Sequence, residues 1–327
     1  MSADSTSTAA VLNLVADDMQ AVDQVIRHRL QSEVPLVSQV SEYLVAAGGK
    51  RLRPALLLLM CGALGFNGSH RLNLAAVVEF IHTATLLHDD VVDDSTLRRG
   101  RATANSAFGN PASVLVGDFL YSRAFQMMVE VGDMRVMQTL SEATNIIAEG
   151  EVLQLMNMHD ASLSEDSYLR VIRSKTAKLF EASARLAALL AQSPPALENA
   201  CAEYGQALGT AFQVIDDLLD YNGDAVLMGK NLGDDLREGK ATLPLIIAMQ
   251  RAAPLDRAII AGAIQTGSTT EMPQIMAIVK ATGALRATEE AAAAEARRAL
   301  GALKNLPISK YRDALEQLAS QLLDRQA

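Results

Sequence analysis

The chain has 327 residues, of which 50% are hydrophobic and 20% are charged, a composition that is ordinary for a globular protein with a large core. A formal net charge of −9 argues against nucleic acid as the main partner. The two cysteines stand in no metal-binding spacing, and no apolar run reaches the ~18–20 residues of a membrane span, so we expect a cytoplasmic protein without a transmembrane segment.

Residues 1–10 are rich in Ser and Thr and lack the apolar and basic segments of a targeting peptide, so we expect a disordered tail there. From residue 11 onward, apolar residues recur at helical spacing. The pattern predicts helices over residues 11–30, 35–45, 56–64, 72–92, 112–131, 134–158, 168–190 and 197–221. Four shorter helices are expected between residues 254 and 323, and the segment 289–300 is expected to be exposed. No stretch has a convincing strand pattern, so the fold class is all-α, with a single domain over residues 11–327.

The first polar feature in the chain lies between two predicted helices, at residues 47–54. Two glycines end one helix, Lys50, Arg51 and Arg53 follow, and Pro54 suits the first turn of the next helix. A helix N-terminus with basic residues beside it binds anions readily. The sequence therefore favours an anion site here, with a solvated loop as the alternative.

Two acidic clusters of the form DDxxD follow long apolar helices, at residues 89–93 and 216–220. Residues four apart lie on one helix face, so Asp89 and Asp93 point the same way, as do Asp216 and Asp220. Like charges at this spacing repel each other, and a cation relieves the repulsion. Clustered Asp oxygens suit Mg²⁺, which is bound through one or two carboxylates plus substrate phosphates. A solvated acidic helix end is the alternative, which the second copy makes less favourable.

Other polar residues interrupt the apolar helices or follow them. His82 lies seven residues before Asp89 on the same face, and Lys175 and Thr176 lie within an apolar helix. The arginines at 98, 99 and 101 suit either a phosphate or simple neutralisation of the acids. The segment 222–240, rich in Gly and charge, predicts an active-site lid, with a linker as the alternative.

Five ordered motifs resemble one known family. They are GGKRLRP at 48–54, LLHDDVVDDSTLRRG at 86–100, SKTAKLF at 174–180, FQVIDDLLD at 212–220 and GKNLGDDLREGKATLP at 229–244. Together they resemble the trans-polyprenyl diphosphate synthases, and the stretches between them resemble the bacterial octaprenyl group of that family. The resemblance covers about residues 10–325 and is dense to about 250. It implies a single helical bundle around a central cavity and a homodimer.

The resemblance also implies a role for individual residues. Asp89, Asp93, Asp216 and Asp220 are implied ligands of Mg²⁺. The implied isopentenyl diphosphate site consists of Lys50, Arg53, His82 and Arg99. The implied site for the allylic diphosphate, which we expect to be farnesyl diphosphate, consists of Arg98, Lys175, Thr176, Gln213, Lys230 and Lys240. We expect Lys175 and Lys240, with the four aspartates, to carry the catalysis.

Product length is expected to depend on small residues just before the first acidic cluster. Ala84 and Thr85 lie about one helical turn before Asp89, and in short-chain members of the family a bulky aromatic residue near here closes the pocket. Met127 and Met128 are candidates for the floor of the channel, or ordinary core residues. By resemblance the product has eight isoprene units, with nine as the alternative, and it supplies a quinone side chain such as that of ubiquinone.

Four other functions use some of these features. A geranylgeranyl diphosphate synthase has the same chemistry, and a terpene cyclase has a DDxxD motif but no need of Lys50 and Arg53. An HD-type phosphohydrolase is suggested by His88-Asp89 but requires more histidine ligands than five poorly spaced ones supply. A non-catalytic subunit of a heteromeric synthase typically lacks the acidic motifs, which are intact here.

Overall fold

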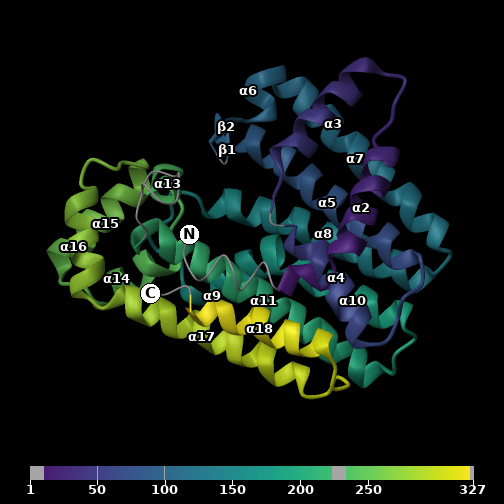
Figure 1. Ribbon diagram of the computed structural model, residues 1–327. Helices are drawn as coiled ribbons and strands as arrows, with labels where there is room; N and C mark the ends of the chain where they lie inside the picture. The colour runs from purple at the N-terminus through teal and green to yellow at the C-terminus, as the bar shows by residue number, and fades with distance from the viewer. Residues whose placement is uncertain (1–10, 50, 99, 223–232, 325–327) are drawn as a thin grey trace. The chain divides into compact units, whose positions relative to one another are not determined.

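Helices make up nearly all of the structure, a computed structural model that describes residues 11–49, 51–98, 100–222 and 233–324 (Figure 1). The all-α expectation is confirmed. The chain divides into two compact units. The first consists of Met1–Thr144, Leu179–Ala202 and Ala302–Leu318, and the second of Asn145–Lys178, Glu203–Gly301 and Ala319–Ala327. The expectation of a single domain stays a prediction.

The first unit is built around α5, His70–Val92, whose apolar surface extends nearly all the way round. The helix packs against α2, α4 and α7, and residues from Leu74 to Leu87 are buried along its length. The other helices that lie wholly or mostly in this unit are α2 Ala16–Arg29, α3 Pro35–Ala47, α4 Leu52–Ala63, α6 Ala104–Phe108, α7 Asn110–Val131 and α10 Lys178–Leu190. Gly48, at φ +62°, follows α3 in the left-handed conformation that commonly ends helices.

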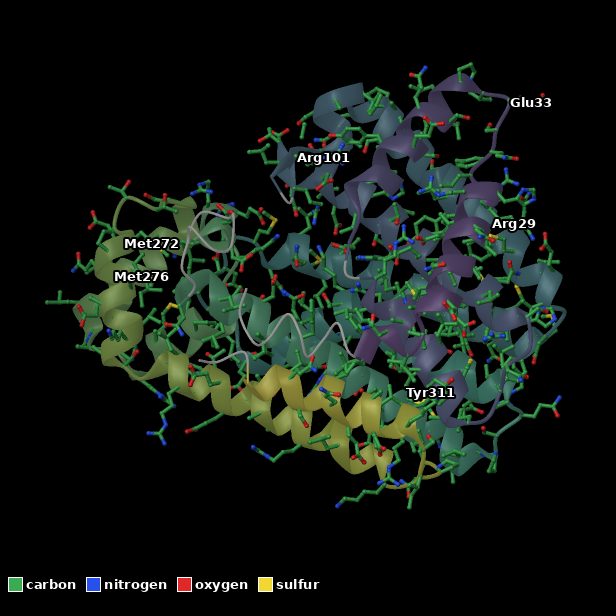
Figure 2. All side chains as sticks on the ribbon, viewed as in Figure 1. Arg29, Glu33, Arg101, Met272, Met276 and Tyr311 are labelled. Carbon is green, nitrogen blue, oxygen red and sulfur yellow. The ribbon has the colours of Figure 1, made fainter. Side chains whose placement is uncertain are left out.

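The second unit has its own core, formed where α14 packs against α9, α15 and α16. Met272 and Met276, labelled on α16 in Figure 2, pack against this core. The elements wholly inside the unit are α9 Glu165–Ile172, η1 Arg173–Ala177, α13 Asp234–Arg237, α14 Leu243–Arg251, α15 Pro254–Thr266 and α16 Met272–Ala281. Four longer helices contribute residues to both units, namely α8 Met134–Asn157, α11 Pro195–Asn222, α17 Ala284–Leu303 and α18 Lys310–Asp324.

Three local predictions were wrong. The helix expected over 168–190 is interrupted by the π-helical turn η1. It also begins earlier, with α9 at Glu165, where Ser164 caps the helix by accepting a hydrogen bond from the Ser167 N–H. The polar segment after the first acidic motif, which its composition predicts to be a loop, instead contains a short antiparallel hairpin in which β1, Leu97–Arg98, pairs with β2, Arg101–Ala102. The segment 289–300 is not simply exposed. Ala292, Ala296 and Ala299 are buried, and their spacing of four and three residues puts them on one face of α17.

None of the helices within the described ranges is both long enough and apolar enough to cross a bilayer. Cys61 and Cys201 are free and buried.

A buried carboxylate joins three helices of the first unit. Glu198, at the start of α11, contacts Arg135 of α8 at 2.5 Å and Arg185 of α10 at 3.0 Å. Its side chain is only 9% exposed, so it has little water to replace a lost partner. The three-residue cluster therefore fixes how α8, α10 and the start of α11 pack.

We expect Glu198→Gln to lower the free energy of unfolding by about 1.5–3 kcal/mol, since it removes charge-assisted hydrogen bonds from a buried site. Urea unfolding followed by circular dichroism measures the loss. The matched control is Glu290→Gln, because Glu290 pairs with Arg286 on an exposed helix face and should contribute about 0–1 kcal/mol. Equal losses of unfolding free energy in the two variants would contradict the stabilising role of the Glu198 cluster.

Candidate active site

The first acidic motif lies at the C-terminal end of α5. Asp89 occupies the last turn, and Asp93 is the C-cap residue, whose N–H donates to the Asp89 carbonyl at 2.8 Å. This bond places the two residues one turn apart on the same face, as the spacing predicts. Both side chains are half-buried, whereas the intervening Asp90 is buried.

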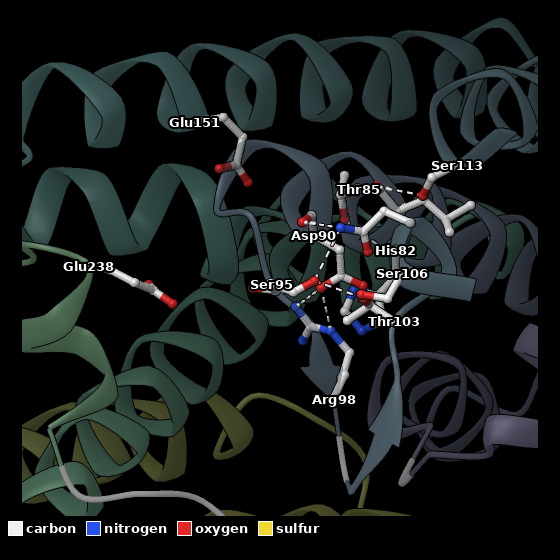
Figure 3. Close-up of polar contacts among 12 residues, drawn as sticks. His82, Thr85, Asp90, Ser95, Arg98, Thr103, Ser106, Ser113, Glu151 and Glu238 are labelled. Atoms are coloured by element: carbon white, nitrogen blue, oxygen red, sulfur yellow. Dashed lines mark hydrogen bonds and ion pairs between the residues drawn. The ribbon is translucent and has the colours of Figure 1, made fainter. Parts of the chain in front are cut away.

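Asp90 is held by the hairpin that follows the motif. The Arg98 guanidinium donates from Nε at 2.9 Å and from Nη2 at 2.8 Å to Asp90 Oδ1, as Figure 3 shows. The Asn105 amide also donates to the Asp90 main-chain carbonyl at 3.0 Å. Burial raises the pKa of Asp90, and the hydrogen bond from Arg98 opposes that shift. Arg98 therefore serves at least to neutralise an acid, which is one of the two roles that the sequence left open.

The second acidic motif, on α11, likewise contains a buried acid beside a more exposed one. Asp216 is exposed, while Asp217 is buried. Asp217 accepts hydrogen bonds from the Tyr168 hydroxyl at 2.6 Å and from the Gln213 amide at 2.7 Å. Burial raises the pKa of Asp217 to about 7, and the two hydrogen bonds oppose the shift. In each motif, then, the second aspartate is buried and anchored, and the first is more exposed.

Asp220, the last acid of the second motif, is also buried. Its two carboxylate oxygens accept hydrogen bonds at 3.3 Å from the backbone N–H groups of Asp234 and Asp235, at the start of α13. Nearby, burial raises the pKa of Asp235 well above its ordinary value, and the charges of Asp217 and Asp220 add to the effect. Asp220 thus holds the backbone at the start of α13, in addition to any role as a metal ligand.

In the first unit, the predicted isopentenyl-binding residues Arg53 and His82 are brought together. Arg53 Nη1 lies 3.2 Å from His82 Nε2, and its guanidinium lies over the Phe180 ring, 4.4 Å from the centroid. Burial lowers the pKa of Arg53 to about 10, and the charge of Glu79 opposes this shift. Arg53 therefore keeps its positive charge at neutral pH.

In the second unit, four of the residues predicted to bind the allylic substrate, Lys175, Thr176, Gln213 and Lys240, are placed by polar contacts. Lys175 and Thr176 lie in η1. Lys175 Nζ is 2.5 Å from Glu151 of α8, and the Thr176 hydroxyl donates to Gln213 at 3.0 Å. Lys240 forms an ion pair with Glu238. The sequence analysis missed Glu151 and Tyr168, although a lysine on an apolar helix face is itself a signal that a counter-ion is near.

Lys50, Arg99 and Lys230 lie outside the described residues, as does most of the predicted lid at 222–240. Ala84, Met127 and Met128 are fully buried, and Thr85 is half-buried and donates to the His82 carbonyl at 2.8 Å. Complete burial agrees with both readings of the methionines, as channel floor and as ordinary core.

The described part of the chain contains no group of three or more His, Cys, Asp or Glu side chains placed to hold a metal by themselves. His88 does not supply such a group, because its Nε2 lies 3.2 Å from the Val114 carbonyl and 3.5 Å from Asp118, both on α7. This arrangement gives no support to an HD-type phosphohydrolase.

Comparison with known proteins gives a consistent result. Residues 34–281 match the model of the family described as polyprenyl synthetase. The octaprenyl diphosphate synthase of Escherichia coli is 51% identical over 95% of this chain and 97% of its own length. The all-trans-nonaprenyl-diphosphate synthase (geranyl-diphosphate specific) of Rhodobacter capsulatus is 49% identical over 96% of this chain and 97% of its own length.

A solved structure, the polyprenyl synthase of Caulobacter crescentus complexed with calcium and isoprenyl diphosphate, superimposes with a TM-score of 0.92 and 46% identity, covering 98% of each chain. The family match spans the basic motif, both acidic motifs and the helices that carry them. The chain therefore belongs to the polyprenyl synthetase family.

Proposed function

We propose that this protein is a long-chain all-trans polyprenyl diphosphate synthase that adds isopentenyl diphosphate to an allylic diphosphate primer until the product has about eight isoprene units. The observation that carries the proposal is the pattern that the two acidic motifs share, in which Asp90 or Asp217 is buried and anchored and the preceding Asp89 or Asp216 is more exposed. Octaprenyl and nonaprenyl relatives near 50% identity support the product length.

Divalent metal is the cofactor that these acids suit, and we assign it to Mg²⁺. We assign Asp89, Asp93 and Asp216 as its ligands, with Asp220 as a further candidate whose carboxylate also holds the start of α13. The calcium and isoprenyl diphosphate bound in the Caulobacter crescentus relative favour a site for a divalent ion with a diphosphate. When bound, the metal neutralises the charge that grows on the diphosphate leaving group.

The reaction breaks the C–O bond of the allylic substrate, and the electron pair leaves with the diphosphate. The double bond of isopentenyl diphosphate attacks the resulting cation, a new C–C bond forms, and a proton is then lost to restore the double bond. No side chain in the sequence stands out as the base, and the family resemblance implies that the released diphosphate takes the proton. The chain contributes fixed positive charge and apolar walls that exclude water.

The cations described above fit two diphosphates. Arg53 lies beside His82, and its guanidinium is held in place over the Phe180 ring. We assign Arg53 and His82, together with Lys50 and Arg99, to the binding of isopentenyl diphosphate. Lys175, Thr176, Gln213 and Lys240 serve the allylic diphosphate, together with Arg98 and Lys230. We take farnesyl diphosphate as the primer, and geranyl diphosphate, named for the Rhodobacter capsulatus relative, as the alternative.

We also propose a homodimer and a cytoplasmic location. The exposed face of α7 carries Leu115, Phe125 and Val129, with Leu115 and Val129 more than 60% exposed. Their spacing of ten and four residues puts them on one stripe of the helix. A stripe of large apolar side chains on a long helix suits the isologous interface of a twofold dimer.

The first prediction concerns the reaction itself. Purified protein with Mg²⁺, labelled isopentenyl diphosphate and farnesyl diphosphate should incorporate label and yield octaprenyl diphosphate, resolved by chromatography after dephosphorylation. A product that stops at four units would favour a geranylgeranyl diphosphate synthase. No incorporation by the protein alone, with activity restored by a second chain, would favour a non-catalytic subunit.

The second prediction concerns the metal. Asp89→Ala and Asp216→Ala should each remove most turnover without lowering the melting temperature, because each removes a metal-binding carboxylate that is not part of the core and relieves repulsion among acids. Asp94→Asn is the matched control. Asp94 is exposed at φ +49°, a conformation that asparagine tolerates, so this variant should keep normal turnover. Near-normal rates in either alanine variant at saturating Mg²⁺ would refute the assignment.

The third prediction concerns product length. Ala84→Tyr should turn over but release a product of farnesyl or geranylgeranyl length, because the added ring would block a tail that runs along α5 from the acids. Thr85→Phe, at a half-buried position one residue closer to Asp89, should shorten the product in the same way if the buried Ala84 site does not accept a ring. Full-length product from the folded variants at a normal rate would exclude this path for the tail.

A further inference from the structure

The π-helical turn η1 lies between α9 and α10 and carries Lys175 and Thr176. A π-helical turn holds one residue more than an α-helical turn, has poorer packing along its axis and usually occurs at functional sites. At 3.6 residues per α-helical turn, one inserted residue changes the direction of the following side chains by about 100°. The place of Lys175 and Thr176 therefore depends on whether this turn keeps its π-helical form.

A glycine on α8 lets the turn lie unusually close to that helix. A Cβ atom at Gly150 would lie 2.8 Å from the backbone nitrogen of Lys175 and 2.8 Å from Cβ of Ser174, nearer than real Cβ atoms come to other atoms. The Lys175 nitrogen belongs to the backbone, so it cannot move aside as the end of a side chain would. Any residue other than glycine at position 150 must push η1 and α8 apart.

Two ion pairs hold the turn on either side of this contact. Lys175 pairs with Glu151, the neighbour of Gly150 on α8. Arg173, at the start of η1, contacts Glu295 of α17 at 2.8 Å, and the second oxygen of Glu295 lies 3.0 Å from Arg298. The Glu295 side chain is only 14% exposed, so its contact with Arg173 is shielded from water and salt.

We propose that Gly150 and Glu295 are positioning residues that keep η1 in its π-helical form and thereby place Lys175 and Thr176 for the allylic diphosphate. Neither residue touches the substrate. The inference rests on the proposed function, from which it takes the role of Lys175. It also gives α17, where the sequence showed no chemistry, a part in substrate binding.

The test compares Gly150→Ala with Gly262→Ala in full-length protein. Gly262 lies in α15 with nothing within 4 Å of a built Cβ, so its replacement should leave activity unchanged. Gly150→Ala should lower kcat/KM for the allylic diphosphate by about 10- to 100-fold, the loss that a small misplacement of a binding group causes. The KM for isopentenyl diphosphate should stay near the wild-type value. Equal effects on both substrates, or none, would overturn the inference.

A second pair of variants covers the case in which Gly150→Ala does not fold. Glu295→Gln keeps the shape of the side chain and removes its charge, and it should raise the KM for the allylic diphosphate in the same selective way. Glu290→Gln, on the exposed face of the same helix, is the control and should behave as wild type. Glu295→Asp, which keeps the charge, should recover part of the loss. A Glu295→Gln enzyme with unchanged kinetics would overturn the role of α17.

Lys175→Ala distinguishes a failure of the proposed allylic diphosphate site from a failure of the positioning inference. If it selectively weakens use of the allylic diphosphate while Gly150→Ala and Glu295→Gln do not, the proposed substrate site stands and the positioning inference is wrong. If Lys175→Ala leaves the allylic kinetics unchanged, the assignment of Lys175 fails, and the positioning inference fails with it.

Discussion

Electrostatic repulsion between carboxylates at helical spacing is the constraint on which both acidic motifs depend. Four acids at the end of one helix and three on another cannot all be buried as unpaired charges. The structure resolves this by burying the second acid of each pair against dedicated donors, Arg98 for Asp90 and the Tyr168 hydroxyl with Gln213 for Asp217. Asp89, Asp93 and Asp216 remain more exposed, where a divalent cation can relieve the remaining repulsion, whereas Asp220 is buried against the backbone of α13.

The anchors of the buried acids also organise the segments that follow. Arg98 comes from the β1–β2 hairpin, so its contact with Asp90 ties that hairpin to the end of α5. Asp220 has the corresponding effect in the second unit, because its carboxylate holds the backbone where α13 begins. In addition to the metal-binding role that we propose for it, each acidic motif therefore fixes the backbone that lies near it. Removing its inner acids would disturb the neighbouring backbone, whereas removing its outer acids would not.

The π-helical turn shows a different use of tertiary contacts. Its sequence, Arg-Ser-Lys-Thr-Ala, contains no glycine or proline that would break a helix, and the residues on both sides are α-helical. What distinguishes the turn is its surroundings, since Gly150, Glu151 and Glu295 come from α8 and α17. A locally unfavourable geometry persists where packing and ion pairs from distant segments outweigh its cost.

The sequence by itself determined the all-α class, most helix boundaries to within a few residues, the two acidic motifs and the pairing of residue types with diphosphate chemistry. The fold class, the helix boundaries and the acidic motifs follow from periodicity, capping and spacing, which are local, whereas the pairing with diphosphate chemistry comes from the resemblance to the polyprenyl diphosphate synthases. Only the tertiary structure decided that Asp90 and Asp217 are anchors, that Arg98 neutralises an acid, that Ala292, Ala296 and Ala299 are buried, and that residues 173–177 form a π-helical turn. Each of these features depends on a distant partner, such as Tyr168 for Asp217 or Glu295 for Arg173. The helical periodicity of a segment carries no information about which distant side chain will contact it.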